Sequence, residues 1–211
     1  MNIILIGAAG KMGREIVKCL PCDDQIVQKI DVDNMPDMSA DVDVIIDFST
    51  AKDRASYIDF ATKNRVPYCC FATGISDEDM SSLKKLSQRV PVLVCSNASV
   101  GVNLMFEIAD IVSKKVDGAD IVLTEYHHKS KKDTPSGTAK KLEEIISLNG
   151  KNVKTNALRV GNECGTHVLQ FFFEDEILEI KHIAKSRKIF ALGAIKMARS
   201  VCKRKKGLHT K

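Results

Sequence analysis

The chain has 211 residues, of which 44% are hydrophobic, and a formal net charge of +5 at pH 7. This length and composition suit a globular protein of one large domain or two small ones. No apolar run approaches the length of a membrane span, and the N-terminus lacks the basic start of a secretory signal. We therefore expect a cytoplasmic protein with no membrane association.

The N-terminus predicts a buried strand, Asn2–Ile6, then a glycine-rich turn, then a helix over residues 14–20 with Ile16, Val17 and Leu20 inward. This order is typical of a Rossmann unit, in which small residues let backbone N–H groups approach a pyrophosphate. The glycines are spaced G-x-x-G-x-x-G rather than the common G-x-G-x-x-G, so a plain tight turn is the alternative. The candidate cofactor-binding residues of the turn are Gly7, Ala8, Ala9, Gly10, Lys11, Met12 and Gly13.

A second predicted strand, Gln25–Ile30, ends at Asp31, which is roughly 20 residues after the glycines, as in dinucleotide-binding domains. An acidic residue there binds the adenosine ribose hydroxyls of NAD and repels the extra phosphate of NADP. We therefore expect NADH as the preferred cofactor and NADPH as the alternative, since Lys11 or Lys29 could offset the repulsion. A turn aspartate is the other interpretation of Asp31, because further aspartates follow it closely.

Strands and helices continue to alternate through the N-terminal half of the chain. Residues 42–48, 67–71 and 90–95 predict strands, and residues 51–64 and 76–89 predict helices. Regular alternation of this kind predicts a parallel, doubly wound sheet.

Residues 125–139, E-Y-H-H-K-S-K-K-D-T-P-S-G-T-A, form the most informative stretch. A predicted strand over 120–124 leads into two histidines and three lysines. Residues 133–138 then indicate a helix start, in which proline fits the first turn and serine or threonine caps it. The N–H groups near Gly137 and Thr138 would bind a carboxylate or phosphate, and a nearby histidine and lysine could protonate a dicarboxylate. A solvated basic loop is the alternative.

The stretch resembles the signature of the 4-hydroxy-tetrahydrodipicolinate reductase family, E-x-H-H-x-x-K-x-D-x-P-S-G-T-A, at every fixed position. That family reduces a cyclic intermediate of the diaminopimelate route to lysine. The resemblance implies His127 as proton donor, Lys131 as its partner in acid catalysis, and His128 as a contact to a substrate carboxylate. The implied ligands of a carboxylate at the helix N-terminus are Ser136, Gly137 and Thr138.

The resemblance extends over essentially the whole chain. The glycine turn has the family's form G-x-x-G-x-M-G, and residues 47–50 resemble a family run at the nicotinamide half of the cofactor. At residues 71–74 the family usually has G-T-T-G, whereas this chain has F-A-T-G. Phe71 therefore replaces a glycine, and its side chain either packs on the cofactor or fills the core. Residues 97–103 resemble the family's crossover between domains. The further implied cofactor-binding residues are Phe48, Phe71, Ala72, Thr73, Cys95, Ser96, Asn97 and Ala98.

The C-terminal half predicts strands over residues 156–160, 167–173 and 176–182, arranged as a meander in an open mixed sheet. In the family that sheet builds a tetramer, so the resemblance implies a homotetramer. We expect a Rossmann-type α/β dinucleotide-binding domain over 1–98 with 188–211, and an α+β substrate-binding and tetramerisation domain over 99–187. His167 and His182 are expected to be structural.

Other candidate functions have weaker support. The seven cysteines are odd in number, which favours reduced thiols, and Cys19 and Cys22 form the single C-x-x-C, so we expect no metal site. The basic run 203–206 has no interleaved aromatic residues and is expected to be solvated rather than bound to nucleic acid. A catalytically silent dinucleotide-binding paralogue is the alternative to an enzyme.

Overall fold

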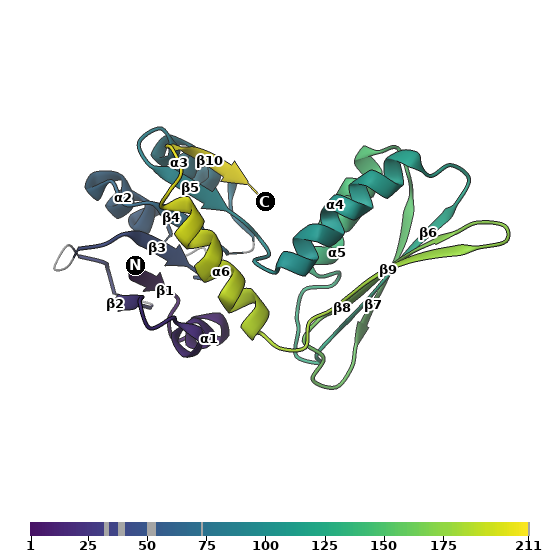
Figure 1. Cartoon of the computed structure of the whole chain (residues 1–211), viewed down its shortest axis with the longest axis horizontal. Coiled ribbons are helices and arrows are strands. Elements are labelled where there is room, and N and C mark those ends of the chain that lie inside the picture. The colour runs from purple at the N-terminus through teal and green to yellow at the C-terminus, as the bar shows by residue number, and fades with distance from the viewer. Residues whose placement is uncertain (32–33, 38–40, 50–53, 73, 211) are drawn as a thin grey trace. The chain divides into compact units, whose positions relative to one another are not determined.

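The computed structural model describes residues 1–31, 34–37, 41–49, 54–72 and 74–210. These residues fold into two compact units, which are Met1–Ala98 with Lys188–Lys211, and Ser99–Arg187 (Figure 1). Each unit has its own sheet and its own core. No helix in the described part of the chain is long and apolar enough to cross a membrane.

The first unit contains a six-stranded parallel sheet with the order β10-β5-β4-β3-β1-β2 (Figure 1). This confirms the expected doubly wound sheet. The strand order reverses between β1 and β3, and such switch points are where open parallel sheets bind ligands. The strands are β1 (Asn2–Ile6), β2 (Gln25–Ile30), β3 (Val44–Asp47), β4 (Tyr68–Cys70), β5 (Pro91–Val94) and β10 (Gly207–Thr210).

Helices cover both faces of this sheet, which explains why β1 and β5 are nearly continuous apolar runs. Helices α1 (Lys11–Cys19) and α6 (Lys188–Val201) pack on one face, and α2 (Arg54–Asn64) and α3 (Asp77–Ser87) pack on the other. One expectation is wrong here, because Val17 is 38% exposed rather than inward. The helix begins at Lys11, and the core side of α1 is formed by Gly13 and Ile16.

The second unit contains a four-stranded mixed sheet with the order β7-β6-β8-β9 (Figure 1). Helices α4 (Val100–Lys115) and α5 (Gly137–Leu148) share a core with it. The mixed sheet is as expected, but the meander is wrong, because β7 lies parallel to β6 and away from β8. A parallel neighbour requires a crossover, and α5 provides it. The strands are β6 (Asp120–His127), β7 (Val153–Arg159), β8 (Thr166–Phe172) and β9 (Ile177–Ile183).

Candidate active site

Strand β6 carries two functional side chains into the buried face of its sheet. Its residues alternate between buried and half-buried, so Glu125 and His127 lie on the same face as Ile121 and Leu123. The strand extends to His127, three residues beyond the expected end at residue 124, because β7 and β8 pair with its last residues from both sides. The carboxylate of Glu125 and the imidazole of His127 therefore extend the row of buried side chains that begins with Ile121 and Leu123.

The start of α5 is capped by Ser136. Its hydroxyl accepts a hydrogen bond from the backbone N–H of Ala139 at 3.2 Å. Pro135 precedes this cap, so the expected place for proline inside the first turn is wrong, although the expected serine cap is present. Gly137 is exposed, and a Cβ built on it would meet no heavy atom within 4 Å. The positive end of the helix dipole here favours an anion.

Glu125 is the centre of the polar network below this helix start. Its Oε1 accepts hydrogen bonds from the backbone N–H of Ser136 and from Nη2 of Arg159, each at 3.1 Å. Its Oε2 lies 3.1 Å from Nδ1 of His127 and 3.7 Å from Nε2 of His167. Burial opposes the charge, but the contacts with His127 and Ser136 outweigh it and lower the pKa of Glu125 to about 2. Glu125 is therefore a buried carboxylate at neutral pH.

His167 on β8 closes the network from the other side. Its Nε2 lies 3.2 Å from the hydroxyl of Ser136, and its ring meets the ring of His127 edge to face, with centroids 5.2 Å apart. Burial, together with the nearby His127, lowers the pKa of His167 to about 3, so this ring is neutral at pH 7.

The side chains of Glu125, His127 and His167 have the donor types of a metal site, and one donor atom of each lies within 4.8 Å of the others. However, the guanidinium of Arg159 contacts the same carboxylate, and the hydroxyl of Ser136 contacts His167. A cation would be repelled by the guanidinium. We therefore interpret these groups as a network of charged and polar side chains.

The loop after β6 holds the other predicted catalytic residue. Lys131 is partly buried, and its Nζ lies 2.8 Å from Oδ2 of Asp133. That ammonium group lowers the pKa of Asp133 against the opposing effect of burial. His128 is half-buried, with Nδ1 at 2.9 Å from the hydroxyl of Ser130. The sequence pattern did not assign a role to Asp133, which anchors Lys131 here.

In the first unit, the glycine turn is held closely by its neighbours. The N–H of Gly7 donates to the carbonyl of Ile30 at 2.8 Å, and Gly7 has a φ of +79°, which favours glycine. A Cβ on Gly13 would collide with the carbonyl oxygen of Gly7 and the backbone of Ala8. No side chain caps α1, whose cap residue is Gly10. Backbone groups therefore form this candidate phosphate cradle.

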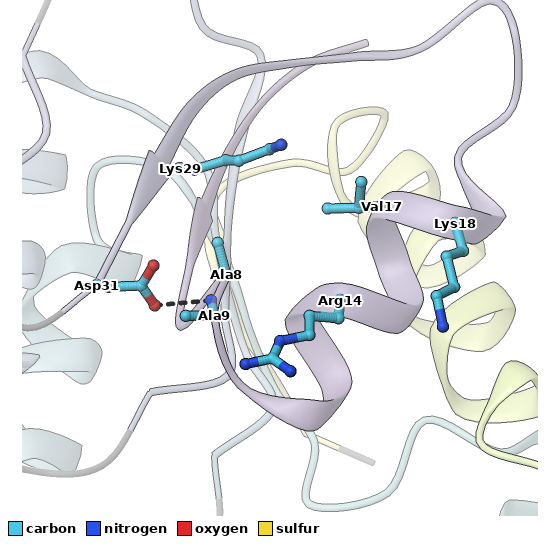
Figure 2. Close-up of a pocket in the computed structure, with 7 residues that line it drawn as sticks. All are labelled: Ala8, Ala9, Arg14, Val17, Lys18, Lys29 and Asp31. Atoms are coloured by element: carbon cyan, nitrogen blue, oxygen red, sulfur yellow. Dashed lines mark hydrogen bonds between the residues drawn. The ribbon is translucent and has the colours of Figure 1, made fainter.

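A pocket lies beside the turn (Figure 2). Asp31 lines it, and its Oδ1 accepts a hydrogen bond from the N–H of Ala9 at 2.8 Å, drawn as a dashed line in the figure. Sequence reasoning missed Arg14 and Lys18, although their spacing of four residues places them on one helix face. The residues lining the pocket are Ala8, Ala9, Arg14, Val17, Lys18, Lys29 and Asp31.

The remaining predicted cofactor residues follow β3, β4 and β5, whose carboxyl ends share one sheet edge with the glycine turn. Phe48 and Phe71 stack, with ring centroids 5.1 Å apart, and Phe71 belongs to the core. The backbone of Phe48 also approaches Gly7. Thr73 lies outside the described residues. Of the others, Ala72, Cys95 and Ala98 are buried, Asn97 is half-buried and Ser96 is exposed.

Comparisons with known proteins identify the family. A family model described as "Dihydrodipicolinate reductase, C-terminus" matches residues 101–210, and one described as "Dihydrodipicolinate reductase, N-terminus" matches residues 25–98. This chain belongs to the dihydrodipicolinate reductase family. The N-terminal model matches within the first unit, and the C-terminal model spans nearly all of the second unit together with α6 and β10 of the first.

Named relatives and solved structures agree with this family. The 4-hydroxy-tetrahydrodipicolinate reductase of Rickettsia rickettsii is 36% identical over 94% of this chain and 92% of its own length. The enzyme of that name from Archaeoglobus fulgidus is 32% identical over 100% and 98%. A dipicolinate-bound dihydrodipicolinate reductase from Paenisporosarcina sp. TG-14 matches with a TM-score of 0.81, at 20% identity, over 100% of this chain and 97% of that chain. This last likeness establishes the fold.

Proposed function

We propose that this chain catalyses the NAD(P)H-dependent reduction of 4-hydroxy-tetrahydrodipicolinate to tetrahydrodipicolinate in the diaminopimelate route of lysine biosynthesis. The observation that carries this proposal is the contact of one buried carboxylate, Glu125, with both His127 and the N-terminus of α5. A proton donor is thereby held beside an anion site, as the reduction of a dicarboxylate requires. The relatives at 32% and 36% identity carry the name of this reaction.

The second unit is proposed to bind and protonate the substrate. Ser136, Gly137 and Thr138 receive one carboxylate at the start of α5, where the helix dipole is positive. His128 contacts a carboxylate, and His127 delivers a proton to the substrate. Lys131 is the partner of His127 in acid catalysis and stabilises the negative charge that develops when a hydride arrives. The Paenisporosarcina relative binds dipicolinate, a dicarboxylate, which supports this substrate class.

The first unit is proposed to bind the dinucleotide, which supplies the hydride when bound. The backbone of the turn from Gly7 to Gly13 fits a pyrophosphate, because it brings N–H groups to the start of α1 without a capping side chain. The strand ends around Phe48 and residues 95–98 lie at the same sheet edge, and we assign them to the nicotinamide half. Phe71 fills the core beneath them.

We propose NADH as the preferred reductant, with NADPH also accepted. Asp31 follows β2 at the position that contacts the adenosine ribose, and its carboxylate disfavours an added phosphate. Lys29 and Arg14 line the same pocket and moderate that repulsion (Figure 2). Replacing Asp31 with serine should therefore raise the NADPH-to-NADH ratio of kcat/KM by about tenfold, the effect of roughly 1.4 kcal/mol.

We further propose a cytoplasmic homotetramer. The outer face of the second sheet exposes Leu158, Ile177 and Ile183 to 41–58%. Exposed apolar residues on one open sheet face favour association between copies. All seven cysteines are free thiols, as suits a reducing compartment. A mass near 23.3 kDa in light scattering would contradict the assembly, and four times that mass would support it.

The reaction is tested by nicotinamide oxidation with purified protein. The substrate is generated in place by the upstream synthase from pyruvate and aspartate semialdehyde, with NADH and NADPH assayed side by side. We expect rapid, synthase-dependent oxidation. A folded, cofactor-binding protein that oxidises neither cofactor would contradict the proposal and favour the catalytically silent paralogue.

A further inference from the structure

Glu125 contacts two parts of the candidate site at the same time. Its Oε1 accepts from the backbone N–H of Ser136, which caps the carboxylate-binding helix. Its Oε2 lies 3.1 Å from Nδ1 of His127, an ion-pair distance. The ring N–H of His127 is not aligned closely enough with this oxygen for a well-formed hydrogen bond. Such contacts commonly tighten when substrate binds.

Arg159 stabilises Glu125 in this position. Its Nη2 donates to the carboxylate at 3.1 Å, to the carbonyl of Asp133 at 2.6 Å and to the hydroxyl of Thr134 at 3.1 Å. The guanidinium compensates the charge of a carboxylate that is fully buried. It also ties Glu125 to the loop that leads into α5. Strand β7 therefore fixes the carboxylate from the side opposite to His167.

Gly165 lies beside the second ring nitrogen of His127, Nε2. A Cβ on Gly165 would lie 3.0 Å from Nε2 of His127, and Gly165 has a φ of +149° that side chains rarely adopt. Both the space and the backbone angle therefore favour glycine at this position. A larger residue would cover the nitrogen from which a proton must leave.

We propose that Glu125 is a positioning residue that fixes the ring of His127 with its Nδ1 proton toward the carboxylate and its Nε2 toward the substrate. This inference rests on the proposed role of His127 as proton donor. A carboxylate beside one ring nitrogen sets the tautomer and orientation of a histidine and stabilises its protonated form. No electron transfer is assigned to Glu125, which keeps its charge while His127 loses and regains a proton.

Several other charged or titratable groups lie around His127 and its neighbour His167. They are Arg159 on β7, His182 on β9, and Lys131 and Asp133 in the loop after β6. His167 is neutral at pH 7, and burial also lowers the pKa of His182. Arg159 and Lys131 carry positive charge, whereas Glu125 places a carboxylate oxygen 3.1 Å from Nδ1 of His127.

The test is the pH profile of Glu125→Gln in the synthase-coupled oxidation assay. Glutamine keeps the size of the side chain and can still accept from the N–H of Ser136, but it removes the negative charge beside Nδ1. We expect kcat to fall by about tenfold, with a smaller change in KM. The basic limb of the kcat profile should move to lower pH by about 1 unit, because protonated His127 loses its carboxylate.

Glu144→Gln is the matched control, because Glu144 is an exposed residue of α5 paired with Lys141. It should keep the wild-type profile. If Glu125→Gln does not fold, Glu125→Asp preserves the buried charge and withdraws it from Nδ1. The basic limb of that variant should also move to lower pH, by a smaller amount.

A wild-type pH profile in folded Glu125→Gln, or in Glu125→Asp if glutamine is not tolerated, would overturn the inference. An equal loss of kcat with no movement of the basic limb would also overturn it, because that result indicates a structural role only. These outcomes require an active wild-type protein. Lack of turnover by the wild type is a different result, which would contradict the proposed function itself.

Discussion

The helices α1 and α5 both start with glycine-containing turns, but their first turns are built in opposite ways. At α1, no side chain caps the helix, and Gly13 is buried against the backbone of Gly7 and Ala8. At α5, the hydroxyl of Ser136 caps the helix, and Gly137 is exposed, with no heavy atom within 4 Å of the point where a Cβ would lie. Packing requires the glycine at α1, whereas packing does not require it at α5.

This difference separates two reasons for a glycine in an anion-binding motif. The cradle of the first unit is made of backbone, and its glycines allow strand, turn and helix to approach each other. The start of α5 is supported by side chains, among them Glu125 and His167. We infer that Gly137 keeps space for the substrate carboxylate. The chemistry and the titratable groups are therefore expected in the second unit.

His127→Gln should have the largest effect on turnover. Removal of the proton donor should lower kcat by roughly 10²-fold, the usual contribution of a general acid. NADH affinity should stay unchanged, because the cofactor cradle is built in the first unit. Steady-state kinetics and cofactor titration measure both effects. Lys129→Gln, at an exposed lysine of the same stretch, serves as control. Near-normal kcat in His127→Gln would refute its assignment as proton donor.

Gly13→Ala should mainly reduce stability. The added methyl group collides with backbone atoms that cannot rotate away, so we expect a loss of about 3 kcal/mol in the free energy of unfolding. Urea denaturation followed by circular dichroism measures it. Unchanged stability would show that the turn can rearrange, and the contrast between the two helix starts would then fail.

The second unit should also be sensitive to acid through His167. Its pKa is about 3 when folded and 6.5 in an unfolded chain, so the unfolded state binds more protons between these values. The contribution of neutral His167 to the free energy of unfolding is complete above pH 6.5 and is lost as the pH falls toward 3. Between pH 7 and 5 the loss should be about 2 kcal/mol.

His167→Gln should lose less stability than the wild type over the same interval. Urea denaturation at pH 7 and pH 5 makes the comparison. The carboxylate of Glu125 adds little to the change in stability between pH 7 and pH 5. Its pKa falls from 4.5 to about 2 on folding, so its contribution to stability is lost only below pH 5. Equal pH dependence in both proteins would argue against a buried, neutral His167.

Local patterns predicted much of the fold. The apolar run of β1, the glycine turn and the cap at Ser136 follow from residues that are close in sequence. Strand β10 was not predicted, because its four residues carry a weak pattern and gain their partner, β5, only through tertiary pairing. The position of β7 beside β6 likewise depends on the crossover through α5.

The residues of the site were predictable where the family signature names them, but the contacts between those residues were not. The alternation of β6 could have indicated that Glu125 and His127 share a face, since they are two residues apart. Arg159 and His167 come from β7 and β8, and the sequence does not show which strands flank β6. The contact of Lys131 with Asp133 was also missed, because acidic and basic residues in a loop have many candidate partners.

The most direct test of the role given to α5 is the affinity of Gly137→Ala for dipicolinate, the dicarboxylate bound by the Paenisporosarcina relative. Isothermal titration would compare it with the wild type, and thermal unfolding without ligand would report stability. We predict a Kd raised by about tenfold, or roughly 1.4 kcal/mol, with an unchanged melting temperature. Wild-type affinity, or a loss of stability as large as that of Gly13→Ala, would contradict the assignment of Gly137 to the substrate carboxylate.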